Sequence, residues 1–217
     1  YRFIAIWIQT ILSPIISSLL FLTVLYLAIG VDRPDVLGAS FIIFLAPGLI
    51  AMQVIQQAFA HSSSCLMIGK IYGNIVDIIY APLSPSEVVI SVSLGAVTRS
   101  LLIAIISILA FKLILNNEIN NYLLLGTFTF LSSFIMANLG IIAGLWAEKF
   151  DHMASVTNFL IVPLSFLSGT FYSIERLPEI LQIISKANPF FYMIDGFRYS
   201  FIGKADGSIK IGLLYLS

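Results

Sequence analysis

The run 122-YLLLGTFTFLSSFIMANLGIIAGLW-146 decides the fold class of this chain. It contains no Asp, Glu, Lys or Arg, and a helix of about 20 mostly apolar residues crosses the roughly 30 Å hydrocarbon core of a bilayer. A strand reading is excluded because the run shows no alternation of apolar and polar residues. The run therefore predicts a transmembrane helix, and we expect an all-α polytopic membrane protein.

The composition of the whole chain gives the same answer. Of its 217 residues, 59% are hydrophobic and 10% are charged, with a mean hydropathy of +1.01. Soluble domains are about a quarter charged, and a chain of this size cannot hide so much apolar surface in one core. A soluble enzyme and a disordered protein are excluded. The apolar composition makes the lipid bilayer an expected partner. The 11 basic and 11 acidic residues cancel, so we expect no nucleic acid as a partner.

Similar runs elsewhere in the chain predict the other membrane spans. We expect spans at 3–29, 36–60, 87–111, 122–146 and 156–171, with an incomplete span at 209–217. The chain starts inside the first run and stops inside the last one, so we expect it to lack an N-terminal segment and most of a sixth helix. Pro47 and Gly48 predict a kink in the second span.

The polar segment 61–86 between the second and third spans carries a striped pattern. Ile71, Ile75 and Ile78 recur at helical spacing, while Asn74 and Asp77 lie off that stripe. This pattern predicts a short amphipathic helix, which either lies along the membrane surface or docks on a partner. The following Ser84-Pro85-Ser86-Glu87 is a capping box that predicts an abrupt start of the third span.

One cation lies well inside a predicted span. Arg99 is about 21 Å along the third helix, where a charge is expensive unless it faces the bundle or a wet cavity. Its candidate partners are Gln53, Gln56, Gln57, Asn138 or a bound anionic group, and we leave open whether it packs helices or lines a transport path. Gly140 and Gly144 form a GxxxG pair that predicts close approach of the fourth span to another helix.

The segment 172–207 is half-polar and rich in aromatic residues. The helix before it contains Pro163 and breaks at Ser168 and Gly169. Pro178 then opens a second helix, and Asn188 and Pro189 close it; Asp195 and Arg198 follow at a spacing that allows an ion pair. Two short helices rimmed by aromatic residues predict a re-entrant hairpin that dips into the outer leaflet and returns.

Several kinds of chemistry lack the residues that they need. Cys65 is the only cysteine, and the charged segment 148–152 matches no metal or acid–base motif, so we expect a solvated loop there, no metal and no catalytic residues. Gly69-Lys70 lacks the other residues of a phosphate-binding loop. We therefore expect no cofactor in this chain.

The conspicuous motifs together resemble the ABC-2 type export permeases. The C-terminal signature is carried by Pro163–Tyr172, Leu177-Pro178, Asn188-Pro189 and Asp195–Arg198; upstream matches are Ala81–Ser84, Gly95–Arg99 and Asn138–Gly140. The sequence of the C-terminal motifs is similar to that of bacterial inner-membrane permeases with unassigned substrates, and also to that of nodulation-factor and polysaccharide exporters. Members of this family usually carry an acidic residue and an Arg ahead of the helix that contacts the ATPase. These two residues have no clear match in His61–Ile68.

This resemblance implies the topology, the subunits and the location of a transporter. It implies six membrane helices with cytoplasmic termini, two permease copies and a dimer of ABC ATPase subunits that bind ATP and Mg²⁺, in a bacterial inner membrane. It makes Ile71–Tyr80, Tyr72 included, the coupling helix that contacts the ATPase. It makes Leu177–Tyr199 the outer gate.

We therefore expect a permease subunit of an ATP-driven export system that is not itself an enzyme. The alternative is a secondary transporter or channel driven by an ion gradient, which would need acidic residues at mid-membrane where the spans offer only Arg99. A membrane-embedded lipid enzyme is a third, weaker alternative. The transported substrate is not readable from the residues.

Overall fold

The computed structural model describes residues 11–30, 35–115 and 119–216, and within these ranges the chain is helical, without a named strand. Four of its helices are long and apolar enough to cross a membrane. The elements are α2 (Ser13–Leu25), η2 (Tyr26–Gly30), α3 (Phe41–Ile71), α4 (Ile75–Tyr80), α5 (Pro85–Leu115), α6 (Tyr122–Trp146), α7 (Phe150–Val156), η3 (Thr157–Ile161), α8 (Val162–Leu167), η4 (Ile174–Arg176), α9 (Glu179–Ala187), α10 (Pro189–Ile202) and α11 (Ile209–Leu216).

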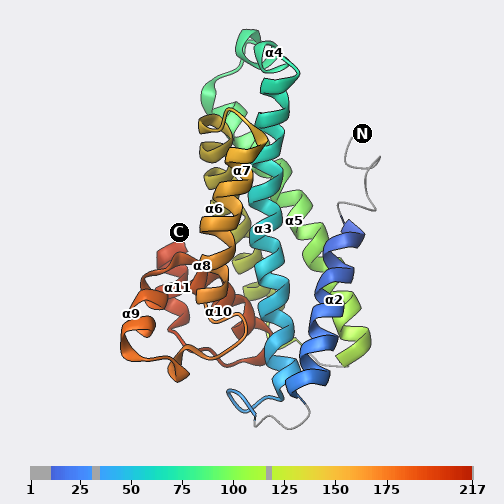
Figure 1. The fold of residues 1–217 in the computed structure, drawn as a ribbon, viewed down its shortest axis with the longest axis vertical. Helices are drawn as coiled ribbons and strands as arrows, with labels where there is room; N and C mark the ends of the chain where they lie inside the picture. Colours follow the sequence, from blue (N-terminus) through green and yellow to red (C-terminus); the bar gives the residue numbers. More distant parts are fainter. Residues whose placement is uncertain (1–10, 31–34, 116–118, 217) are drawn as a thin grey trace.

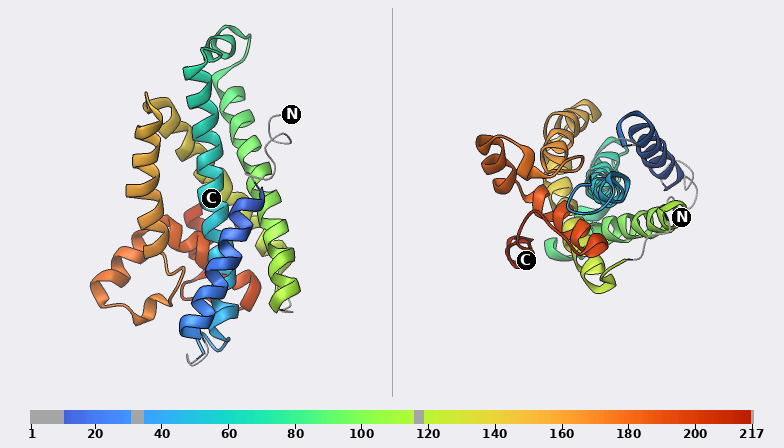
Figure 2. Two further views of the ribbon diagram at one scale, coloured as in Figure 1. Left: turned by 45° about the vertical axis from the view of Figure 1, so that its right-hand side comes forward. Right: turned by 90° about the horizontal axis from the view of Figure 1, so that it is seen from below.

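Helix α3 is the central rod of the fold. It packs along α6 and α5, and α2 and α10 also lie against it (Figures 1 and 2). The short helix α4 lies at one end of the longest axis, and the α9–α10 hairpin lies toward the other end (Figure 1). The buried core is built around α3, and Phe44, Ile55 and Phe59 are among its fully buried side chains.

The glycine pair of α6 brings that helix against α3, as the sequence predicts. A Cβ added at Gly140 would lie 2.1 Å from Ser62 Oγ, and one at Gly144 would lie 2.9 Å from the carbonyl oxygen of Ser63. Small residues at these positions let the two backbones approach closely. The contact holds the start of the predicted polar segment 61–86, around residues 62 and 63, inside the helix bundle.

Helix α3 is longer than the span predicted at 36–60. Helix α3 starts at Phe41 instead of 36 and continues to Ile71 instead of 60, so the expected polar segment 61–86 begins as helix. Its hydroxyl side chains do not break the helix, because Ser62, Ser63 and Ser64 each donate to a carbonyl about one turn earlier. The helix also continues through Pro47, which lies inside it.

Most of the other helices differ from the predicted spans at their ends. Helix α6 has the predicted bounds, whereas α5 extends the predicted 87–111 to Pro85–Leu115. The fifth span is predicted at 156–171, but α7, η3 and α8 run from Phe150 to Leu167. The expected charged loop 148–152 is therefore helical from Phe150, and Asp151 suits the first turn of a helix. Of the first span, residues 3–10 lie outside the described ranges, and α11 represents the last.

A lysine at the end of α3 caps the neighbouring helix. Lys70 Nζ donates to the carbonyl oxygens of Leu145 and Ala147, the latter at 3.0 Å. These carbonyls belong to the last turn of α6, where helix carbonyls lack partners and the helix dipole favours a cation. The end of α3 beyond the bundle is thereby held beside the end of α6.

Candidate functional site

Residues Ile71–Tyr80, which we call the α4 segment, are largely exposed. The segment has no buried residue, and Tyr72, Ile79 and Tyr80 expose 74%, 71% and 84% of their surface. Of the predicted helix Ile71–Tyr80, only Ile75–Tyr80 is a separate helix. Ile71 ends α3, and a turn with Gly73 at a φ of +75° separates the two helices. Contiguous exposed apolar side chains of this kind mark interaction surfaces.

The polar residues of the α4 segment are exposed together with its apolar residues. Asn74 precedes the helix, and Asp77 lies in its first turn, where a carboxylate suits the helix dipole. Of the predicted isoleucine stripe, Ile71 and Ile78 are exposed and Ile75 is partly covered. The segment thus presents apolar and acidic groups side by side without burying them on this chain.

The capping box fastens the other end of this segment to α5. Ser84 N donates to Glu87 Oε2 at 2.7 Å, and Glu87 N donates to Ser84 Oγ at 3.3 Å, as the sequence predicts. The reciprocal bonds satisfy two backbone donors at the start of the helix. The α4 segment is therefore joined to two long helices, α3 through a tight turn and α5 through a capped start.

The four polar residues predicted for mid-membrane do not form one cluster. Arg99 Nη2 donates to Gln57 Oε1 at 2.8 Å, and Arg99 Nη1 lies 3.1 Å from His61 Nδ1. Gln53 instead donates to the Pro14 carbonyl of α2. Asn138 donates to the carbonyl of Phe134 at 2.8 Å and accepts from Ser93. The sequence indicated that Arg99 faces the bundle, but His61 became its neighbour only because α3 continues past residue 60.

The hairpin is attached to α8 by polar side chains near its predicted breaks. Asn188 caps α10 by accepting from Phe190 N at 3.1 Å, and its Nδ2 donates to Leu164 O and Ser168 Oγ, both at 2.9 Å. Ser185 Oγ donates to the carbonyl of Leu167 at 2.8 Å. These bonds use carbonyls that the end of α8 leaves without helical partners.

The predicted glycine break and two of the prolines lie at the ends of helices. Pro163 is in the first turn of α8, and Gly169 follows its end with a φ of +74°. Pro178 precedes α9 as its N-cap, and Pro189 is the first residue of α10. Pro178 and Pro189 occupy positions where a backbone donor is not required, whereas Pro163 lies within the continuous helical run Phe150–Leu167, directly after the π-helical turn η3.

Asp195 and Arg198 lie on the same helix, but each bonds to backbone groups of another segment. Asp195 accepts from the N–H groups of Asp206 and Gly207, at 3.0 and 2.8 Å. Arg198 donates to the carbonyls of Gly169 and Thr170, at 2.7 and 3.3 Å. The predicted pair is thus coupled through the field of its charges, while its hydrogen bonds tie α10 to the segments before α9 and after α10.

Burial dominates the electrostatics of this pair. It raises the pKa of Asp195 to about 6, against the opposing effects of the nearby Arg198 charge and of the two backbone donors. Asp206 continues the network, because its carboxylate accepts from Ser173 Oγ at 2.5 Å and from Ile174 N at 3.1 Å. No local sequence pattern marks Asp206 and Ser173, because their hydrogen bond joins loops that meet only in the fold.

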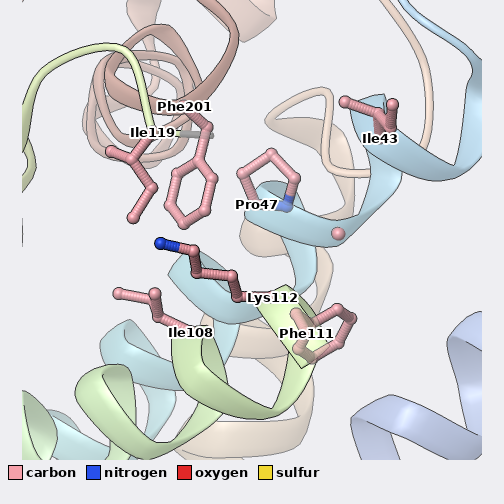
Figure 3. A pocket seen from close by; sticks show the side chains of 8 residues that line it. Ile43, Pro47, Ile108, Phe111, Lys112, Ile119 and Phe201 are labelled. Carbon is pink, nitrogen blue, oxygen red and sulfur yellow. The ribbon is translucent and has the colours of Figure 1, made fainter. Parts of the chain in front are cut away.

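A narrow cavity lies beside Pro47, between α3, α5 and α10. Its volume is about 20 Å³, and its walls are mostly apolar, with the Lys112 side chain reaching across it toward Ile119 and Phe201 (Figure 3). A cavity of this size holds about one water, so it is not a passage for cargo. No group of three or more potential metal ligands occurs in the described ranges.

Known proteins show the same sequence pattern over nearly the whole chain. The family model described as ABC-2 type transporter matches residues 1–202. The inner membrane transport permease YadH of Escherichia coli K12 is 32% identical over 206 residues, which cover 95% of this chain and 80% of the relative. Nodulation protein J of Rhizobium leguminosarum bv. viciae is 25% identical over 212 residues, covering 95% and 81%. No solved structure matches the chain.

These matches agree with the helical architecture and with its apolar spans. The family model covers most of the chain, and the E. coli relative is similar along nearly all of it. The four long apolar helices of the described ranges are those of a multi-pass membrane protein. The chain belongs to the ABC-2 type transporter family of membrane permeases.

Proposed function

We propose that this chain is the permease subunit of an ATP-driven ABC export system in the bacterial inner membrane. Two permease copies would enclose the translocation path, and two ATPase subunits with ATP and Mg²⁺ would supply the energy. Family membership supports the class of machine, and the printed name of the E. coli relative supports the inner membrane. The chain itself carries no phosphate-binding loop.

The exposed α4 segment is the observation that carries this proposal. Helices α3 and α5 have 31 residues each, about 46 Å at helical rise, whereas the hydrocarbon core is about 30 Å thick. The two helices therefore extend beyond the hydrocarbon, and α4 joins them at that end (Figure 1). We propose that this end is cytoplasmic and that the ATPase covers Tyr72, Ile79 and Tyr80, while Asn74 and Asp77 bond to its polar groups.

A matched pair of substitutions tests the contact with the ATPase. Ile79→Glu adds a charge to the α4 segment, and Ile180→Glu adds the same charge to α9, where the isoleucine is similarly exposed. We expect Ile79→Glu to abolish co-purification of the co-expressed ATPase and Ile180→Glu to preserve it. Retention of the ATPase by Ile79→Glu and by the double variant Asp77→Arg, Ile75→Glu would contradict the assignment.

Cysteine labelling tests the cytoplasmic placement independently. Cys65 is exposed on α3, so it is first replaced by Ser, and Tyr72→Cys is introduced as the reporter. A membrane-impermeant maleimide should modify this reporter in inside-out vesicles and leave it unmodified in intact spheroplasts. Modification from the outside would overturn the proposed orientation.

In this proposal Arg99 packs α5 against α3. Its guanidinium bonds Gln57 and lies beside His61, so it joins α5 to α3 within the bundle. We expect Arg99→Ala to reduce assembly of the permease and Arg99→Lys to restore part of it. Normal assembly of Arg99→Ala with reduced transport would instead place Arg99 on the translocation path.

A further inference from the structure

We propose that Phe44 and Gly48 of α3 form a seat for the side chain of Arg198, and that this seat passes movement of α3 to the α9–α10 hairpin. We refer to Phe44, Gly48 and Arg198 as the arginine seat. The inference rests on the proposed function, because it needs α4 to be displaced by a partner. It adds two α3 residues that make the hairpin responsive to that displacement.

The contacts of Arg198 define the seat. Its side chain is fully buried, and its guanidinium carbon lies 3.9 Å from the centroid of the Phe44 ring. A guanidinium over an aromatic face is attracted by the ring quadrupole, more strongly when water is excluded. The same guanidinium donates to the carbonyls of Gly169 and Thr170 after α8. One side chain of α10 therefore joins the hairpin to α3 and to the end of α8.

Gly48 makes room for this arrangement. A Cβ added there would lie 2.6 Å from the Thr170 carbonyl oxygen and 3.0 Å from Arg198 Nη2. The first distance is too short for any real Cβ contact, and the partner is backbone, which cannot rotate away. A side chain at position 48 would thus push the turn at residues 169–170 and the Arg198 guanidinium away from α3.

The chemistry of the seat is costly for a contact that only fills space. Arg198 Nε and Nη1 are buried and have no hydrogen-bond partner in the described chain. Filling space alone does not require a buried charge or two donors left without partners. What the guanidinium adds is direction, because its hydrogen bonds hold the carbonyls of one turn while its face lies over one ring.

The hairpin is internally fastened, so a force on Arg198 acts on all of it. Asp195 holds the backbone of residues 206 and 207 after α10, and Asp206 holds Ser173 and Ile174 before α9. The two ends of the segment are therefore bonded to each other through α10. Displacement of Arg198 carries this whole closed segment with it.

Helix α3 connects the seat with the α4 segment. The helix is continuous from Phe41 to Ile71, and Gly48 to Ile71 spans about 35 Å at helical rise. The hydrogen-bonded helix transmits axial and tilting motion over this length, since packed elements are not continuously deformable. A push on α4 therefore shifts Gly48 and Phe44 against the carbonyl turn and Arg198.

Spin-label distances in the permease–ATPase complex test this role without knowledge of the cargo. Labels are placed on Ile183→Cys in α9 and Leu113→Cys in α5, both exposed, in a Cys65→Ser chain. We expect the distance between them to change when ATP and vanadate trap the ATPase. Gly48→Ala and Arg198→Lys should lose this change while the ATPase still binds and hydrolyses ATP, and Phe44→Leu should diminish it.

Gly126→Ala is the matched control, because a Cβ at Gly126 meets nothing within 4 Å. It should keep the full change in distance. A nucleotide-dependent change that persists in Gly48→Ala, Arg198→Lys and Phe44→Leu would overturn the arginine seat, as would its absence from the unaltered complex with ATPase bound. Failure of the unaltered permease to bind any ATPase would overturn the proposed function itself. If Gly48→Ala and Arg198→Lys reduce folding, Phe44→Leu is the variant on which the distance change is measured.

Discussion

The α4 segment and α10 are both short helices rich in large apolar side chains, yet the fold treats them in opposite ways. Helix α4 has no buried residue. Nine of the 14 residues of α10 are buried, among them Asp195 and Arg198. The polar groups of α10 are bonded to neighbouring segments, whereas those of the α4 segment face outward.

This difference separates two kinds of functional segment. The exposed apolar surface of α4 gains stability only when a partner covers it, so its substitution should affect assembly more than folding. The hairpin is fastened within the chain, so its substitution should affect folding first. The following predictions test that division, beginning with the effect expected to be largest.

Removal of the Arg198 charge should destabilise the fold most. In Arg198→Met the carboxylates of Asp195 and Asp206 lose their nearby cation, and the carbonyls of Gly169 and Thr170 lose a donor. Removing one partner of a buried charged group costs about 3–5 kcal/mol. Thermal unfolding of the purified permease in detergent measures this, with the exposed Arg176→Met as control. Equal midpoints for the two variants would refute the role of Arg198 in stability.

Protonation of Asp195 should make stability depend on pH. Its pKa is raised by burial from 3.8 to about 6, so the folded state binds more protons than the unfolded state between these values. The contribution of Asp195 to stability should therefore be largest below about pH 4 and be lost as pH rises through 6, by about 3 kcal/mol in all. Asp195→Asn should flatten this part of the profile of unfolding midpoint against pH.

A side chain at Gly140 should force α6 away from α3. A Cβ at this position would lie 2.1 Å from Ser62 Oγ and 2.6 Å from the Phe59 carbonyl oxygen. Overpacking of this kind costs about 1–3 kcal/mol. Gly126→Val lies on the same helix in open space and controls for helix propensity. Thermal unfolding should distinguish Gly140→Val from this control, and indistinguishable midpoints would show that the interface relaxes freely.

Substitution on α4 should have the smallest effect on folding. Ile79 exposes 71% of its surface, so Ile79→Ser removes little buried area and should change the free energy of unfolding by less than about 0.5 kcal/mol. The same variant should bind less ATPase in a co-purification assay. A large loss of stability in the isolated permease would show that α4 is part of the fold's own core.

Much of the architecture was predictable because its signals are local. The uncharged run 122–146 gave the bounds of α6, the Ser84–Glu87 pattern gave the start of α5, and Asn188-Pro189 gave the junction of α9 and α10. Each depends on side chains within about one turn of the backbone that they affect. The end of α3 was misjudged because serines satisfy their hydroxyls on helix carbonyls and so do not interrupt it.

The candidate site was only partly predictable, because its partners come from distant segments. Gln57 was one of several candidate partners of Arg99, but His61 was not among them. The spacing of Asp195 and Arg198 allowed an ion pair, whereas in the fold the Arg198 guanidinium contacts Phe44 and the backbone after α8. No local pattern marks Gly48 or Asp206 as its neighbours.

By itself, the amino-acid sequence determined that this chain is a helical membrane protein with an amphipathic segment near its third span. The reason is that hydropathy and capping act over a few neighbouring residues. Only the tertiary structure decided which short helix is buried and which polar groups meet. Those choices depend on distances between segments far apart in the chain, as when Gly48 leaves the space that Thr170 and Arg198 occupy.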